Sequence, residues 1–310
     1  MINAYKRNQN TVIRLPSLRS LRNLTDVIWI DLHNPEIKEV GGVEKKFKVN
    51  IPSRLQQEEI ESSSRYIEKD DYIVVNSKFL QKSGTHHYKN VNVSFILKGD
   101  ILITYRESNV RAFDECIKRI ENNTRQFSNG NNIFIALFET RIDFDADYLE
   151  NISKHITEIG KELSKEEGTR SELLKEITEY QEVTMQIREN IIDKQRVVSS
   201  IIKNLDFAED EKERLRILIK DIDSLVDHIN FLFERLEYLQ NTFLGLVNIE
   251  QNKIIKIFTV VSVIIMPPTL IASMYGMNFR FMPILSDLTI RAFIARKSGK
   301  AAINLPIFII

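Results

Sequence analysis

The sequence predicts an α/β domain followed by a long α-helical stalk that continues directly into a transmembrane helix. Three observations lead to this fold class. Short apolar runs rich in β-formers recur in the first 145 residues, Leu and Ile recur at helical spacing before residue 256, and residues 257–279 carry no charge. We therefore expect an α/β domain over 1–145, a stalk over 146–256, a membrane-spanning helix over 257–279 and a separate tail over 280–310.

Four short runs in the first domain have the composition of β-strands. Residues 27–32, 71–75, 91–97 and 100–105 are apolar, rich in Val, Ile and aromatic residues, and flanked by turn-forming residues. A helix is expected over 56–63, between the first strand and the others. This order predicts a sheet with helices packed on it.

The stalk contains one unbroken pattern of apolar residues. Gaps of 3 and 4 alternate for about five heptads, which is typical of a helix with a continuous buried seam. The seam consists of Leu215, Leu218, Ile222, Leu225, Ile229, Leu232, Leu236, Leu239, Phe243 and Leu246. We expect this seam to pack against further copies of the chain. The alternative is a long amphipathic helix that packs on its own domain.

Composition limits the partners and the compartment. Formal net charge is zero with 28% charged residues, so nothing indicates a nucleic-acid partner. The single cysteine, Cys116, excludes an intramolecular disulfide and agrees with a cytosolic domain. The first ten residues lack the apolar segment of a secretory signal. Membrane insertion is therefore expected to depend on residues 257–279, which exceed the roughly 20 apolar residues that a bilayer requires.

A mildly polar and neutral set of side chains follows one side of the expected helix from residue 252 onward. The stripe consists of Asn252, Ile255, Thr259, Ser262, Met266 and Thr269. Because it is neutral and partly polar, it is a candidate lining for an ion pathway. The alternative is helix packing, since Ser and Thr in membrane helices often bond to the backbone. Pro267 and Pro268 should kink this helix.

The stretch ends in Tyr275-Gly276-Met277-Asn278-Phe279. A membrane span that runs into YGMNF resembles the CorA family of divalent-cation channels. The resemblance begins at Asn248-Ile249-Glu250-Gln251-Asn252-Lys253, and it extends more loosely to WIDLHNP, residues 58–72 and ITYRE in the first domain.

This resemblance implies a homopentameric channel in the plasma (inner) membrane, with the N-terminal domain in the cytoplasm. It implies transport of Mg²⁺, and often of Co²⁺ or Ni²⁺, with Gly276, Met277 and Asn278 as the selectivity filter. The positions that match pore-facing residues of the family are Asn252, Ile255, Phe258, Met266 and Thr269. The expected partners are further copies of the chain, membrane lipid and divalent cations, and we expect neither a cofactor nor an enzymatic activity.

A pore for Mg²⁺ does not need carboxylates. The ion dehydrates reluctantly and tends to keep its waters. A ring of Asn278 amides would accept hydrogen bonds from those waters without a charge that traps the ion, and conduction requires such weak binding.

Family members sense cytosolic Mg²⁺ with acidic residues between neighbouring subunits. Asp221, Asp223 and Asp227 are candidates for this role, as is the run Glu209-Asp210-Glu211. The alternative is an ordinary solvated face of the stalk.

The resemblance weakens after Pro283, and the longest uncharged run beyond it, 301–310, is half a span. The tail holds five basic residues and one acidic residue, and Arg280 stands where the family usually has an acid. We expect no second span and interpret the tail as the product of a frameshift or truncation. The rival hypothesis is a membrane-anchored coiled-coil interaction protein without a pore. A soluble enzyme is disfavoured because no nucleophile elbow, phosphate loop or metal-ligand cluster occurs.

Overall fold

The structure is a computed structural model that describes residues 1–8, 11–15, 26–58, 65–84, 88–163, 170–204 and 207–276. The chain divides into two compact units, Met1–Leu244 (unit 1) and Gly245–Ile310 (unit 2). Unit 1 holds a β-sheet and a set of helices, and the described part of unit 2 is the end of one long helix.

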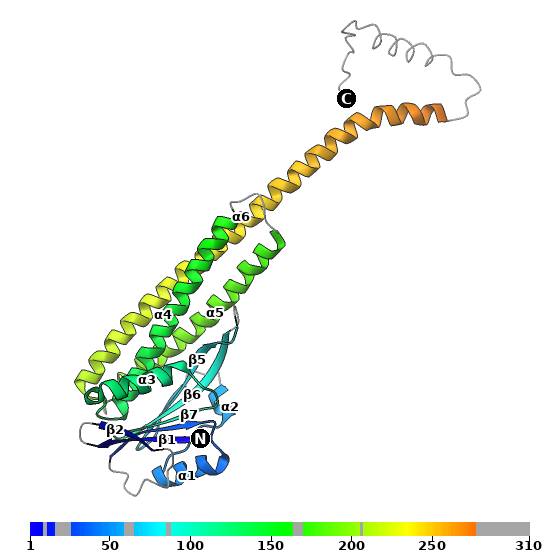
Figure 1. The fold of residues 1–310 in the computed structure, drawn as a ribbon. Coiled ribbons are helices and arrows are strands. Elements are labelled where there is room, and N and C mark those ends of the chain that lie inside the picture. Colours follow the sequence, from blue (N-terminus) through cyan, green and yellow to red (C-terminus); the bar gives the residue numbers. More distant parts are fainter. Residues whose placement is uncertain are drawn as a thin grey trace. The chain divides into compact units, whose positions relative to one another are not determined.

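A mixed sheet forms the base of unit 1, and its described strands number seven. They are β1 (Ile2–Asn8), β2 (Thr11–Leu15), β3 (Val27–His33), β4 (Tyr66–Glu68), β5 (Ile73–Lys82), β6 (Tyr88–Lys98) and β7 (Ile101–Arg106). The spatial order is β2-β1-β3-β7-β6-β5-β4 (Figure 1). β3 and β7 pair in parallel and the other neighbours pair antiparallel. All four predicted strands are thus present.

Helices cover both faces of this sheet, as Figure 1 shows. On one face, Ile30 and Leu32 of β3 pack with Val43 and Phe47 of α1 (Ile37–Phe47). On the other face lie α3 (Arg111–Asn122), α4 (Gly130–Leu163) and α5 (Arg170–Ile201). Burial on both faces explains why β3 is a nearly continuous apolar run rather than an alternating one.

An aromatic cluster forms the core between the sheet and α3 and α4. The ring of Phe95 lies 5.3 Å from that of Phe134 and 5.4 Å from that of Phe138. Gly130 allows α4 to begin directly against the sheet, because a Cβ there would lie 2.3 Å from the backbone nitrogen of Leu102. The structure places α4 across the predicted domain boundary at residue 145.

Between β3 and β5 the described chain also forms α2 (Arg54–Glu58), whereas a helix over 56–63 was predicted. Residues 59–63 lie outside the described part of the chain. A short 3₁₀ turn, Thr124–Gln126, connects α3 to the loop before α4.

The long helix α6 (Glu209–Gly276) begins in unit 1 beside the loop before α4. Glu211 is buried there, and its carboxylate accepts hydrogen bonds from the side chains of Asn129, Asn131 and Asn132 at 2.8–3.2 Å. It also accepts from the backbone nitrogen of Ala208 at 3.1 Å, which caps the first turn of α6. Glu211 is therefore a structural residue and not a free carboxylate for metal sensing.

The prediction that the seam of α6 packs against other copies of the chain is wrong. Eight of its ten members are buried within this single chain, and Leu225 and Leu246 are half-buried. A Cβ on Gly160 of α4 would lie 3.5 Å from Leu239, and Gln181 of α5 donates to Gln240 at 3.1 Å. The alternating 3-4 spacing specifies a buried stripe, but it does not specify which helix covers it, and here α4 and α5 do.

Candidate functional site

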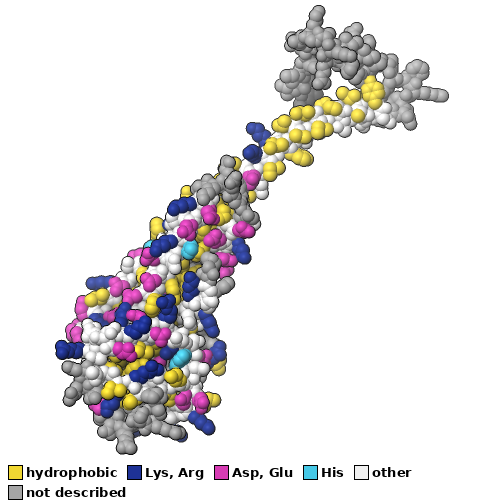
Figure 2. Space-filling view, viewed as in Figure 1, with side chains coloured by type: hydrophobic (Ala, Val, Ile, Leu, Met, Phe, Trp, Pro, Cys, Tyr) yellow, Lys and Arg dark blue, Asp and Glu magenta, His cyan; other side chains and the backbone are white. Residues whose placement is uncertain are grey.

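The described part of unit 2 is an apolar helical segment that the other described residues do not cover. In the described residues, α6 is the helix that is long and apolar enough to cross a membrane, and its apolar stretch is not buried. Figure 2 shows hydrophobic side chains along this end of α6 and many charged side chains on unit 1. Such a surface requires lipid or other protein segments around it.

A concave groove lies along one side of this segment, with a volume of about 590 Å³. It is lined by Phe258, Val261, Ser262, Ile265, Met266, Thr269, Leu270 and Ser273. Four predicted pore-lining residues are therefore brought together here: Phe258, Ser262, Met266 and Thr269. The other three, Asn252, Ile255 and Thr259, are exposed on α6 but do not line the groove.

Two prolines account for the concave shape. Pro267 and Pro268 lie inside α6, and at about 100° per residue Pro267 stands almost opposite Ser262 and Thr269, whereas Pro268 stands to the side of them. A proline ring clashes with the carbonyl four residues earlier, so the helix bends away from the proline side. The groove therefore lies on the inner side of the bend, and Figure 1 shows that this orange part of α6 is curved.

Two threonine hydroxyls present hydrogen-bond acceptors on the apolar part of α6, and of the two only Thr269 lines the groove. Thr259 and Thr269 each donate to the backbone carbonyl four residues earlier, Ile255 and Ile265, at 2.8 Å. A hydroxyl has one hydrogen to donate and two lone pairs that accept. Because the hydrogen is used by the backbone, each side chain offers only lone pairs to a bound water. If these threonines only serve helix packing, the same hydrogen bonds to the backbone form, but the free lone pairs of the hydroxyls bind no ligand.

The hydroxyl-bearing residues that line the groove are Ser262, Thr269 and Ser273. Because proline has no amide hydrogen, the carbonyls of Val263 and Ile264 also lack their usual donor four residues later, but they lie on the proline side of α6, away from the groove. The groove thus contains neutral hydroxyl oxygens and no carboxylate. This chemistry suits a ligand that donates hydrogen bonds, such as the water shell of a divalent cation.

The predicted selectivity filter falls at the edge of the described chain. Gly276 is the last residue of α6, and a Cβ there would meet no atom within 4 Å beyond its chain neighbours and the backbone of its own helical turn. Met277 and Asn278 lie outside the described residues, as does the tail from 280 to 310. The filter and the expected absence of a second span therefore stay predictions.

The three aspartates predicted to sense Mg²⁺ do not form a cluster within one chain. All three are exposed on α6, and Asp223 accepts a hydrogen bond from Gln195 of α5. Asp223 and Asp227 share one face, whereas Asp221 lies on nearly the opposite one. Across the described ranges, no group of three or more His, Cys, Asp or Glu side chains could hold a metal ion.

Sequence reasoning missed a second apolar stripe on the unit 1 part of α6. Ile217, Phe231 and Tyr238 are 51%, 56% and 67% exposed, and their positions differ by multiples of seven. The signal was present in the sequence two residues after Leu215, Ile229 and Leu236. It was overlooked because the prediction followed the longer and unbroken pattern of the seam. This stripe, together with Leu244, which is 48% exposed, gives the unit 1 segment of α6 an apolar surface that the described residues leave uncovered.

Comparisons with known proteins agree with this architecture. Residues 25–295 match the model of a family described as CorA-like Mg²⁺ transporter protein. Proteins named magnesium transport protein CorA are 37% identical over 291 residues in Wolinella succinogenes, 35% over 297 in Campylobacter jejuni and 32% over 289 in Salmonella typhimurium. Each alignment covers 92% of this chain and 90–91% of the relative.

Solved structures share the fold. The complete CorA magnesium transporter of Methanocaldococcus jannaschii gives a TM-score of 0.75 at 20% identity, covering 96% of this chain and 98% of that one. The full-length CmaX protein gives 0.75 at 12% identity, with 96% and 95% covered. The cytoplasmic domain of ZntB from Vibrio parahaemolyticus gives 0.63 at 12% identity, with 79% and 97% covered. These likenesses concern the fold alone.

Proposed function

Because the chain belongs to the family of CorA-like Mg²⁺ transporters, we propose that it is a subunit of a homo-oligomeric channel that carries Mg²⁺ across the plasma membrane. The ion moves down its electrochemical gradient, and no bond of a substrate is made or broken. The observation that carries this proposal is the concave and uncharged side of α6, which includes the hydroxyls of Ser262, Thr269 and Ser273, within a segment long enough to span a bilayer.

The lining is suited to a hydrated ion. Water molecules on Mg²⁺ point their hydrogens outward, and the lone pairs of Thr269 in the groove accept them. Neutral acceptors bind such an ion weakly enough to release it. Asn278, with Gly276 and Met277, supplies the filter in this proposal. Because Co²⁺ and Ni²⁺ also form hydrated divalent ions, we include them among the transported ions.

Oligomerisation follows from the shape of the lining. One helix with one groove cannot enclose a pathway, so the groove must face equivalent grooves of other copies around a symmetry axis. We propose five copies, the number that the resemblance implies. In unit 1 the association surface is the exposed stripe of Ile217, Phe231 and Tyr238, in place of the buried seam.

The charges beside the span indicate its orientation. Lys253 and Lys256 directly precede residues 257–276, and Lys and Arg near a span favour the cytosolic side. We therefore propose that unit 1 lies in the cytoplasm. Asp223 and Asp227, which share one exposed face, are the proposed candidates for Mg²⁺ sensing between neighbouring subunits.

The rival, a membrane-anchored interaction protein without a pore, loses the support of the seam, whereas the expected absence of a second span, which favours it, lies outside the described residues. Its coiled-coil seam is buried within the chain, so the pattern no longer indicates a partner helix. The exposed stripe is compatible with either function. Ion flux separates the two, because only a channel requires the groove.

The test uses two threonines with the same local bond. Thr269→Val removes the acceptor in the groove, and Thr242→Val is the matched control, because Thr242 also donates to the carbonyl four residues earlier, at 2.9 Å, but lies in unit 1. One hydrogen bond contributes about 1 kcal/mol, so flux should fall about fivefold per lost contact in the Thr269 variant. Dye-reported Mg²⁺ entry into proteoliposomes measures it. Equal flux in wild type and both variants would remove the groove from the transport pathway.

A further inference from the structure

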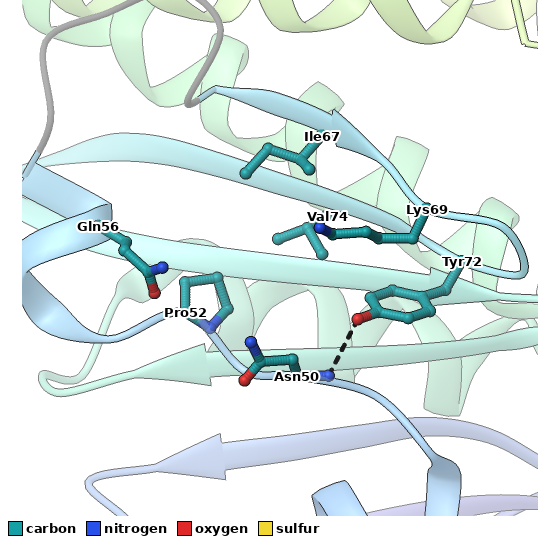
Figure 3. A pocket seen from close by; sticks show the side chains of 7 residues that line it. All are labelled: Asn50, Pro52, Gln56, Ile67, Lys69, Tyr72 and Val74. Atoms are coloured by element: carbon teal, nitrogen blue, oxygen red, sulfur yellow. Dashed lines mark hydrogen bonds between the residues drawn. The ribbon is translucent and has the colours of Figure 1, made fainter.

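A small pocket in unit 1 lies far from the groove in sequence and has no part in the proposed transport. Its volume is about 130 Å³, and it joins the connection after α1 to the β4–β5 hairpin. It is lined by Asn50, Pro52, Gln56, Ile67, Lys69, Tyr72 and Val74. Figure 3 shows the side chain of Lys69 extended over Val74 into this pocket.

The polar groups of the pocket are arranged to donate hydrogen bonds. The Gln56 oxygen already accepts from the backbone nitrogen and the hydroxyl of Ser53, at 2.9 and 3.2 Å. Its amide nitrogen therefore remains as a donor. The Tyr72 hydroxyl oxygen accepts from the backbone nitrogen of Asn50 at 3.2 Å, which leaves the hydroxyl hydrogen free to donate (Figure 3).

Positive charge is present without a carboxylate in the lining. The ammonium group of Lys69 has no ion-pair partner among the described residues. The neighbouring acid Asp71 is paired with Lys98 at 2.5 Å, so this pair adds no net charge beside the pocket. Glu68 accepts from Asn204 at 3.4 Å, outside this pocket.

We propose that this pocket binds a small oxyanion. Lys69 provides the charged anchor, and the amides of Asn50 and Gln56 and the hydroxyl of Tyr72 provide further donors. The volume equals that of about four water molecules, which admits inorganic phosphate or a short carboxylate. The apolar floor of Pro52, Ile67 and Val74 would contact the carbon chain of a carboxylate. A bound anion contacts both the connection after α1 and the β4–β5 hairpin, and it thereby links these two segments.

The test is equilibrium dialysis of the full chain in detergent, without divalent cations, against radiolabelled phosphate in one arm and radiolabelled acetate in the other. The variants are Lys69→Met, which keeps the length of the side chain, and Lys38→Met as control. Lys38 is exposed on α1 in the same unit and does not line the pocket. Fluorescence of Trp29, the only tryptophan, verifies that each variant is folded.

We expect saturable binding of at least one anion to wild type and to the Lys38 variant, with affinity about tenfold lower in the Lys69 variant, since hydrogen bonds to charged groups are the stronger class. Tighter binding of phosphate or of acetate identifies the natural class. The proposal is overturned if neither anion binds saturably to wild type, or if the folded Lys69 variant binds both as wild type does.

Discussion

A buried ionic network joins α4 and α5 to the sheet, and it predicts a non-additive pair of substitutions. Asp145 and Arg141 of α4 and Lys194 of α5 are all at most 1% exposed. Arg141 donates to one carboxylate oxygen of Asp145, and the Lys194 ammonium lies 3.4 Å from the other. Arg141 also donates to the Leu80 carbonyl at 2.7 Å. One carboxylate thus serves two cations.

Asp145→Asn keeps the shape of the side chain and removes the anion, so two cations remain buried. Breaking a buried ion pair in this way costs about 3–5 kcal/mol. For a unit of this size the midpoint of thermal unfolding should fall by roughly 6–20 °C. Adding Lys194→Met removes one of the two orphaned charges. We expect the double variant to recover about 1–3 kcal/mol relative to Asp145→Asn alone.

Fluorescence of Trp29 can report unfolding, because this residue is fully buried in the sheet and its indole nitrogen donates a hydrogen bond to the Thr104 hydroxyl at 3.0 Å. Its fluorescence is followed during thermal unfolding of the full chain in detergent. Asp147→Asn is the control, since Asp147 is exposed on α4 and its loss should change stability by less than about 0.5 kcal/mol. A double variant as unstable as the sum of the two single variants would refute the idea that Asp145 holds both cations.

Other predictions concern the same unit, the oligomer and the filter. Burial lowers the pKa of Lys194 in the folded chain below its ordinary 10.5. Between the folded and the unfolded pKa the unfolded chain therefore holds more protons, and the free energy of unfolding should rise with pH. Unfolding measured at several pH values should show this rise in wild type and not in Lys194→Met. Phe231→Asp with Tyr238→Asp should abolish oligomers in crosslinking while Trp29 fluorescence stays native, and unchanged oligomers would exclude this surface. Asn278→Leu should lose Mg²⁺ flux because it removes the acceptor, whereas flux at the wild-type rate would show that Asn278 only packs. Gly130→Ala should destabilise the fold by about 1–3 kcal/mol in thermal unfolding, because the methyl group meets the backbone of β7.

Strong local patterns were sufficient for much of the fold. The run around Trp29 was recognised as a strand because burial on both faces requires consecutive apolar residues. The uncharged stretch before Gly276 was predicted to be a span by its length, and in the structure it belongs to a helix long and apolar enough to cross a membrane. Helix α1 was missed because Gly41 and Gly42 lower its intrinsic helix propensity. Packing of Val43 and Phe47 on the sheet compensates for them.

For the candidate site, helical periodicity identified one side of α6 but not its shape. Helical periodicity identified Ser262, Met266 and Thr269 as one side, and the structure places them in one groove. Periodicity alone does not locate the concave side, which depends on the bend at Pro267 and Pro268. It also does not identify the partner of a buried stripe, and the seam was therefore assigned to other copies instead of to α4 and α5.

The central claim is that this chain forms a pathway for hydrated Mg²⁺. The most direct measurement is Mg²⁺ entry into liposomes that contain the purified full chain and an enclosed Mg²⁺-sensitive dye, with an imposed Mg²⁺ gradient and no nucleotide. We predict entry that follows the gradient, exceeds that of protein-free liposomes and falls in the Thr269→Val variant but not in Thr242→Val. Entry no faster than in protein-free liposomes, with the protein inserted and oligomeric, would contradict the claim.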